Sequence, residues 1–187
     1  MNAMPLPFRN TRTRFGLIAQ SLHWAVVIGL LLQFIWAWRI DEAESIRQQF
    51  ALVNQHKSIG LTVFGLALIR LAWRFFDRPP AWPESMRAWE RLAASLTHWA
   101  LYGLILAIPL SGWAWSTAAG HSTSWFGALD LPALLPVNEN LADILEELHE
   151  ALAISLLGLA ALHVLAALRH QFVLRDGLMR RILGVDR

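Results

Sequence analysis

Three long stretches of this chain carry no charged side chain, and this feature limits its possible folds more than any other. Residues 15–38 and 151–168 are uncharged, and so are the 38 residues between Arg91 and Asp130. A helix needs about 20 predominantly apolar residues to cross a bilayer. We therefore predict membrane-spanning helices at about residues 15–38, 95–117 and 148–170.

A fourth span is predicted at residues 52–73, although two charges interrupt it. Only 12 residues are uncharged between Lys57 and Arg70, a length that also fits a buried helix of a soluble protein. Spanning length is reached if both long side chains extend toward opposite membrane surfaces. Proline-containing segments separate the spans. The prediction is an all-α integral membrane four-helix bundle, with residues 1–187 as a single domain.

The basic residues predict how this bundle lies in the membrane. Thirteen of the 16 Lys and Arg residues fall on one side of the four spans. They are Arg9, Arg12, Arg14, Arg70, Arg74, Arg78, Arg87, Arg91, Arg169, Arg175, Arg180, Arg181 and Arg187. The positive-inside rule then predicts cytoplasmic N- and C-termini. No cleaved signal peptide is expected before residue 15.

Composition removes several classes of function. The chain has no cysteine, which excludes disulfides, cysteine-ligated iron–sulfur clusters and thiolate nucleophiles. The isoelectric point near 9.9 does not indicate a nucleic-acid partner, because the basic residues follow the membrane pattern. The expected surroundings are membrane lipid.

Four histidines lie within the predicted spans at two depths. His149 and His163 are fourteen residues apart, so both leave one helix face about 21 Å apart along the axis. His23 lies at the depth of His163, and His56 lies at the depth of His149. Neutral imidazole is a good axial ligand of haem iron, and bundles hold cofactors between facing helices. We predict two haems, one on His23 and His163 and one on His56 and His149. The alternative is four hydrogen-bonded or interfacial histidines.

Further residues are candidates for contact with a cofactor or a quinone. Gly60 lies one turn from His56, where a missing side chain would let a macrocycle approach. Arg70 and Arg74 could pair with haem propionates or act only as positive-inside arginines. His98 and His170 could contact a propionate or a quinone head group, or be interfacial residues.

One candidate residue for contact with an external partner lies at the predicted outer side of the bundle. Lys57 is adjacent to His56 and could steer an anion or a protein partner, or simply extend to the surface. The outer loops are otherwise acidic. No glycine-rich phosphate loop, HExxH or GxSxG motif competes with the histidine pattern.

Six short motifs in this order and spacing resemble the bacterial cytochrome b561 family of four-helix, di-haem membrane proteins. They are SLHW at 21–24, HKSIG at 56–60, RLAWR at 70–74, LTHWALY at 96–102, LHEALA at 148–153 and LHVLAALRHQF at 162–172. The resemblance covers essentially the whole chain. It implies b-type haems with paired histidine ligands, on His23 with His163 and on His56 with His149, and electron exchange with membrane ubiquinone.

The same resemblance suggests what lies outside the membrane. The family includes an enzyme that oxidises superoxide and passes the electron to ubiquinone. The HKSIG lysine and the outer loop at 116–133 resemble a sub-branch often associated with a periplasmic lipid-binding protein. A periplasmic partner protein is therefore an alternative to superoxide.

Three hypotheses for function follow. The first is an oxidoreductase that carries electrons between an extracytoplasmic donor or acceptor and membrane quinone. The second is a haem-bearing anchor or electron-transfer subunit for a soluble dehydrogenase. The third is a small-molecule transporter without haem, which would purify as a colourless protein.

Overall fold

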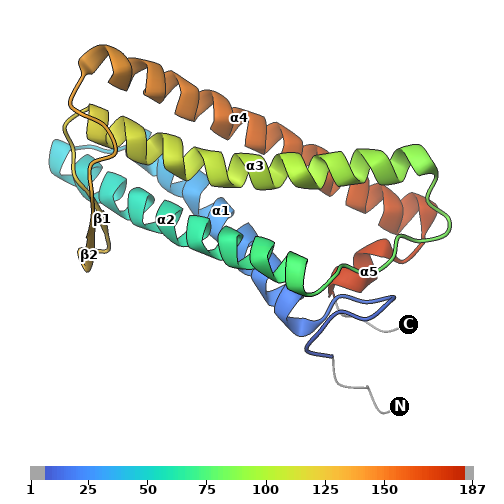
Figure 1. Ribbon diagram of the computed structural model, residues 1–187. Coiled ribbons are helices and arrows are strands. Elements are labelled where there is room, and N and C mark those ends of the chain that lie inside the picture. The colour runs from blue at the N-terminus through green and yellow to red at the C-terminus, as the bar shows by residue number, and fades with distance from the viewer. Residues whose placement is uncertain (1–6, 184–187) are drawn as a thin grey trace.

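The computed structural model describes residues 7–183 and contains four long helices that run back and forth in one bundle (Figure 1). They are α1 (Leu17–Asp41), α2 (Ile46–Phe76), α3 (Ala88–Ala118) and α4 (Glu139–Arg169). A π-helical turn, η1 (His170–Leu174), and the short helix α5 (Leu178–Leu183) follow α4. Arg187, counted above among the basic residues, lies outside the described residues.

All four long helices are long and apolar enough to cross a membrane, which confirms the predicted four-helix membrane bundle. In the most apolar 18-residue window of each helix, only 6–17% of the residues are buried inside the protein. Large apolar side chains such as Ile28, Leu31 and Ile154 are exposed on the outer faces of the bundle. Lipid must cover these side chains, because a bundle of this size cannot bury them internally.

Each helix is longer than the segment predicted to span, because polar residues extend it at its ends. The side chain of Ser45 caps α2 by accepting a hydrogen bond from the backbone N–H of Gln48. The side chain of Asn138 caps α4 in the same way at Leu141. Such caps satisfy backbone donors that the first helical turn leaves unpaired.

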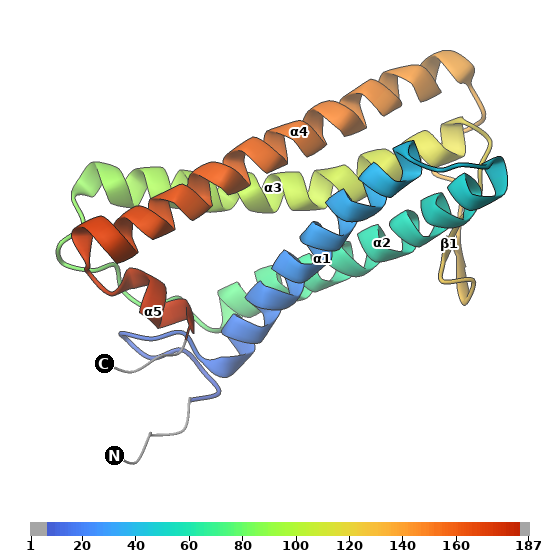
Figure 2. The ribbon, with the colours of Figure 1, turned by 180° about the vertical axis from the view of Figure 1, so that it is seen from behind.

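The connections gather at two opposite ends of the bundle (Figures 1 and 2). At one end the segment before α1, the α2–α3 connection and α5 are joined by hydrogen bonds. The backbone N–H of Phe15 donates to the carbonyl of Arg181, and Asn10 donates to Asp77. At the other end lie the α1–α2 and α3–α4 connections. We call these the α5 end and the hairpin end.

The α3–α4 connection, expected only as a loop, contains a small antiparallel hairpin. Its strands are β1 (Thr123–Trp125) and β2 (Leu129–Leu131), with Ser124 opposite Asp130. Ser58 of α2 anchors the hairpin: its hydroxyl accepts from the N–H of Phe126 and donates to the carbonyl of Ser124. The hairpin is thereby packed against α2.

The buried core lies midway along the bundle. It contains Val26, Val63, Ala67, Ile105 and Leu156, at least one from each long helix. On α4, Leu156 is seven residues from His149 and seven from His163. The apolar core therefore separates two histidine-bearing levels of the bundle.

Candidate functional site

His56 and His149 face each other at the level nearer the hairpin end. Their ring centroids are 6.5 Å apart and the ring planes are inclined by 74°. One ring comes from α2 and the other from α4, and both side chains are half-buried. We call this pair the outer cluster.

Contacts with α3 determine which nitrogen of His149 carries its proton. Nδ1 lies 3.0 Å from the carbonyl oxygen of Ile108 and 3.1 Å from the hydroxyl of Ser111. A carbonyl oxygen can only accept, so Nδ1 is the donor and the neutral ring keeps its lone pair on Nε2. Histidines that bind metals are commonly oriented by such a second hydrogen bond.

Gly112 allows this approach and was missed by the sequence analysis. A Cβ atom built on Gly112 would lie 2.9 Å from Cε1 of His149 and 3.1 Å from its Nδ1. Any larger residue would therefore push the ring away from α3. The neighbouring sequence SGW is a weak signal, because only the crossing of α3 and α4 brings Gly112 to the ring.

Gly60 lies near the outer cluster, but the space beside it is filled rather than open. A Cβ atom on Gly60 would lie 2.5 Å from Nε2 of Gln33 on α1. Gly60 makes room for the Gln33 amide, and its contact with a macrocycle stays a prediction.

Lys57 points to the end of α3 and not freely to the surface. Its Nζ donates to the hydroxyl of Ser116 over 2.8 Å and to the carbonyl of Ser122 over 3.3 Å. Thr123 also donates to the buried Ser116 hydroxyl. These bonds place a half-buried cation beside the outer cluster. This cation has no carboxylate partner among residues 7–183.

A second group of histidines, the inner cluster, lies nearer the α5 end. The rings of His98 and His163 are 5.3 Å apart, inclined by 67°. His98 stacks on Trp82, with centroids 6.2 Å apart and planes 7° apart. His23 lies within electrostatic range of His163, His98 and Arg70. The structure thus adds His98 to the predicted pair of His23 and His163.

Arg70 and Arg74 border the inner cluster. Nε of Arg70 donates to the hydroxyl of Tyr102 over 2.9 Å, and the guanidinium of Arg74 lies 5.6 Å from the ring centre of Trp99. Neither arginine has an ion-pair partner in the described part of the chain. With Trp73 they line a cavity of about 30 Å³.

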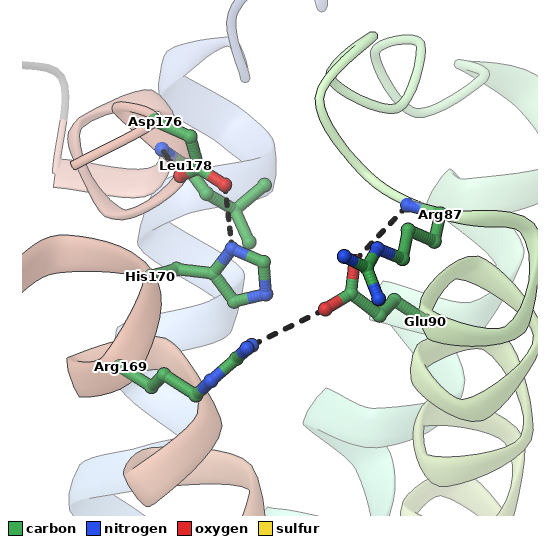
Figure 3. Close-up of polar contacts among 6 residues, drawn as sticks. All are labelled: Arg87, Glu90, Arg169, His170, Asp176 and Leu178. Atoms are coloured by element: carbon green, nitrogen blue, oxygen red, sulfur yellow. Dashed lines mark hydrogen bonds and ion pairs between the residues drawn. The ribbon is translucent and has the colours of Figure 1, made fainter. Parts of the chain in front are cut away.

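His170 lines a different cavity from the one that Arg70 borders. Its Nδ1 contacts Oδ2 of Asp176 at 2.5 Å, and both side chains are less than a tenth exposed. Figure 3 shows His170 between Asp176 and the ion pair of Glu90 with Arg169. We call these four residues the η1 cluster.

Four buried polar atoms have no hydrogen-bond partner within residues 7–183. They are Oε1 of Gln33, Nδ1 of His56, Nε1 of Trp73 and Nδ1 of His98. Native proteins leave few such atoms unpaired, and each unpaired atom needs an explanation, such as a ligand that pairs with it when bound. Two of them lie at the outer cluster and two at the inner cluster, the two levels that carry the facing histidines.

The sequence matches known proteins over nearly its whole length. The prokaryotic cytochrome b561 family model matches residues 14–184. Cytochrome b561 homolog 2 of Escherichia coli (strain K12) is 35% identical, with 96% of each chain covered. A probable superoxide oxidase, CybB, of Yersinia pestis is 30% identical over 93% of this chain and 98% of that relative.

A third relative, cytochrome b562 of Cereibacter sphaeroides, is 30% identical over 87% of this chain and 90% of its own length. The matches extend through all four long helices and include both histidine clusters. The resemblance drawn from the six motifs is confirmed. This chain belongs to the prokaryotic cytochrome b561 family of haem b-binding, multi-pass proteins of the bacterial inner membrane.

Proposed function

We propose that this protein carries electrons across the membrane through two haem b groups, between an extracytoplasmic partner and membrane quinone. His56 and His149 would hold one haem, and His23 and His163 would hold the other. The observation that carries the proposal is the pair of histidine clusters on either side of an apolar core.

The outer cluster fits a haem held by two histidines. An imidazole–metal bond is about 2 Å long, so two rings on opposite sides of one iron have centroids roughly 6 Å apart. The observed 6.5 Å between His56 and His149 is close to that spacing. The lone pair on Nε2 of His149 is the donor that such ligation needs.

The inner cluster supplies the same chemistry with added positive charge. His23 and His163 come from α1 and α4, and both are half-buried. Arg70 and Arg74 are free of carboxylate partners within the described chain and could bind haem propionates through charge-assisted hydrogen bonds. The unpaired Nε1 of Trp73 is another donor at this level.

In this proposal the protein holds the haems, orients their histidine ligands and insulates the space between the two clusters from water. Haem supplies one-electron chemistry, and two histidine ligands leave the iron no open coordination position. The contacts from Ile108 and Ser111 fix the ring of His149. The mid-bundle core keeps water away between the two clusters, so electrons and not ions would cross.

We assign the α5 end to the cytoplasm, on the basis of the positive-inside rule. A reporter fused after Leu183 should behave as cytoplasmic, and one inserted between Asp130 and Asn138 should behave as extracytoplasmic. Paired reporters active on each side of the membrane measure this directly. The opposite pattern would reverse the sidedness of the proposal without changing its haem ligands.

At the extracytoplasmic end the electron partner would meet the outer cluster near Lys57. Superoxide is one candidate, since a relative is a probable superoxide oxidase. A periplasmic protein is another. The fixed cation at Lys57 favours a negatively charged partner in either case.

Electron transfer to quinone is tested on the purified, haem-loaded protein. The haems are reduced chemically, excess reductant is removed, and a short-chain ubiquinone is added while haem absorbance is followed. We expect reoxidation that saturates with quinone concentration. Haems that stay reduced with quinone, yet are oxidised at once by ferricyanide, would show that quinone is not the partner.

A further inference from the structure

We propose that the hairpin of β1 and β2 is an amphipathic arm whose apolar face binds the lipid of the membrane leaflet at the hairpin end. The arm comprises residues 123–131. Three observations support it: the register of the two strands, the face of α2 on which they lie, and the direction in which their apolar side chains point. None of them involves haem or quinone, so the arm is tested separately from the proposed function.

The register of the hairpin gives the arm one apolar face and one polar face. Its three residue pairs are Thr123 with Leu131, Ser124 with Asp130 and Trp125 with Leu129. Successive residues of a strand point to opposite faces, and directly paired residues share a face. The first and third pairs therefore form one face, which carries Trp125, Leu129 and Leu131. The middle pair, Ser124 and Asp130, forms the opposite face and is polar.

The apolar side chains of the arm are open to the surroundings of the protein. Trp125, Phe126 and Leu129 are 41%, 60% and 61% exposed. Phe126 lies in the turn between the strands with φ = 50°, a left-handed conformation that glycine adopts at lower cost. The backbone of the turn therefore does not explain an aromatic side chain at this position, whereas contact with lipid does.

The arm lies on a face of α2 that lipid covers. The hydroxyl of Ser58 holds the turn, and the hydroxyl of Thr62 accepts a hydrogen bond from Nε1 of Trp125 over 3.0 Å. Thr62 and Ile69 follow Ser58 by four and eleven residues, so all three share nearly one face of the helix. Ile69 is 56% exposed on the outside of the bundle. This face of α2 therefore continues beyond the arm as lipid-facing surface.

The hydrogen bond of Trp125 shows that the apolar face points toward the middle of the membrane. Because α2 begins at the hairpin end, Thr62 lies about 6 Å nearer the middle of the bundle than Ser58. The backbone of the arm is held at Ser58, and the indole of Trp125 reaches from there to Thr62. The opposite face, with Asp130, therefore points away from the membrane.

Polar groups beside Ser58 place the arm at the boundary between lipid and water. Lys57 bonds the carbonyl of Ser122, and Ser122 and His121 are exposed. Figures 1 and 2 show the arm projecting from the side of the bundle, across the direction of the helices. An arm lying flat at this level keeps its polar face and unpaired backbone groups among the lipid head groups, since such groups are not tolerated in hydrocarbon. Only the apolar side chains enter the acyl region, where aromatic residues commonly anchor membrane proteins.

Lipid matches this surface better than a protein partner does. A soluble protein that approaches from the water would meet the polar face with Ser124 and Asp130. A second copy packed beside the bundle would meet the tip of the arm, because the apolar face points along the helices and not sideways. Lipid beside α2 lies directly below the apolar face and is continuous with the lipid that covers Ile69.

The absence of cysteine from the chain allows a site-specific test. Leu129→Cys and Asp130→Cys are made separately, and each carries a nitroxide spin label on haem-loaded protein, one copy per lipid nanodisc. Power-saturation electron paramagnetic resonance compares collisions with oxygen, which concentrates in lipid, and with a water-soluble nickel chelate. The ratio of oxygen to nickel collisions should be several times higher at position 129 than at position 130.

Two reference labels define the values expected for lipid and for water. Ile154→Cys lies on the lipid-facing side of α4, where Ile154 is 71% exposed, and Asn140→Cys lies at the exposed start of the same helix. The label at position 129 should resemble the first reference, and the label at position 130 should resemble the second. Ala128→Cys, at the exposed tip of the arm, gives an independent measurement if Leu129→Cys fails to fold, and its label should also resemble the lipid reference.

Three results would overturn the inference. A label at position 129 that matches Asn140→Cys would show that the arm stands in water. A label shielded from both oxygen and nickel would show that protein covers the apolar face. Shielding that appears only with two copies per nanodisc would assign this face to contact between copies. Each result leaves the proposed electron transfer untouched, because no haem ligand is changed.

Discussion

Replacing His149 by alanine should leave the purified protein with one haem b per chain instead of two. The reason is the geometry of the outer cluster, in which His56 and His149 face each other at 6.5 Å and no other histidine ring contacts either. His56→Ala should have the same effect. His23→Ala and His163→Ala should each remove the other haem and leave the outer one.

Haem extraction and quantitation per chain measure this result, and redox titration identifies which haem remains. The matched control is His121→Ala, because His121 is an exposed histidine in the α3–α4 connection and should keep both haems. The assignment is wrong if any of the four variants retains two haems with an unchanged spectrum. Loss of the inner haem in His98→Ala alone would exchange His98 for His23 as ligand.

Replacing Gly112 by alanine should weaken the outer haem selectively. The added Cβ would lie 2.9 Å from the ring of His149, so the ring must move off the Ile108 carbonyl that orients it. Loss of an orienting contact of this kind typically costs about 10–100-fold in metal affinity. The inner haem, about 21 Å away along α4, should be unaffected.

The chain contains a matched control for this substitution. Gly103 lies on the same helix, and a Cβ built there has no neighbour within 4 Å. Gly103→Ala should therefore keep both haems at wild-type occupancy. Low-temperature electron paramagnetic resonance gives a second measurement, because it reports the orientation of the two axial rings. Full outer-haem occupancy with an unchanged signal in Gly112→Ala would contradict the assigned packing.

The prediction of the bundle depended on signals that are local in the sequence. Uncharged runs of spanning length indicate membrane helices whatever their neighbours are, because the cost of placing charge in lipid acts on each segment separately. The spacing of His149 and His163 determines their common face for a similar reason, since helix periodicity is fixed by backbone geometry. The six motifs identified the family because their order covers the whole chain.

The contacts of individual side chains required the tertiary structure. Gly60 and Gly112 look alike in the sequence, yet the first faces Gln33 of α1 and the second faces His149 of α4. Which neighbour a glycine meets depends on how two helices cross. Similarly, the three-residue strands of the hairpin are too short to show an alternating pattern, and Ser58 of α2 anchors them from a distant part of the chain.

His170 shows most clearly the difference between what local sequence signals determine and what the tertiary structure decides. Seven residues after His163, a regular helix would continue to present it on nearly the same face as that ligand. The α-helix instead ends at Arg169, and the π-helical turn η1 with left-handed Arg175 brings Asp176 back to its ring. Helical periodicity determined where the haem-ligand candidates lie along α4. Only the packing at the end of that helix decided that His170 belongs to a separate cavity, because an ion pair between a turn and a helix depends on the path of the chain after the helix ends.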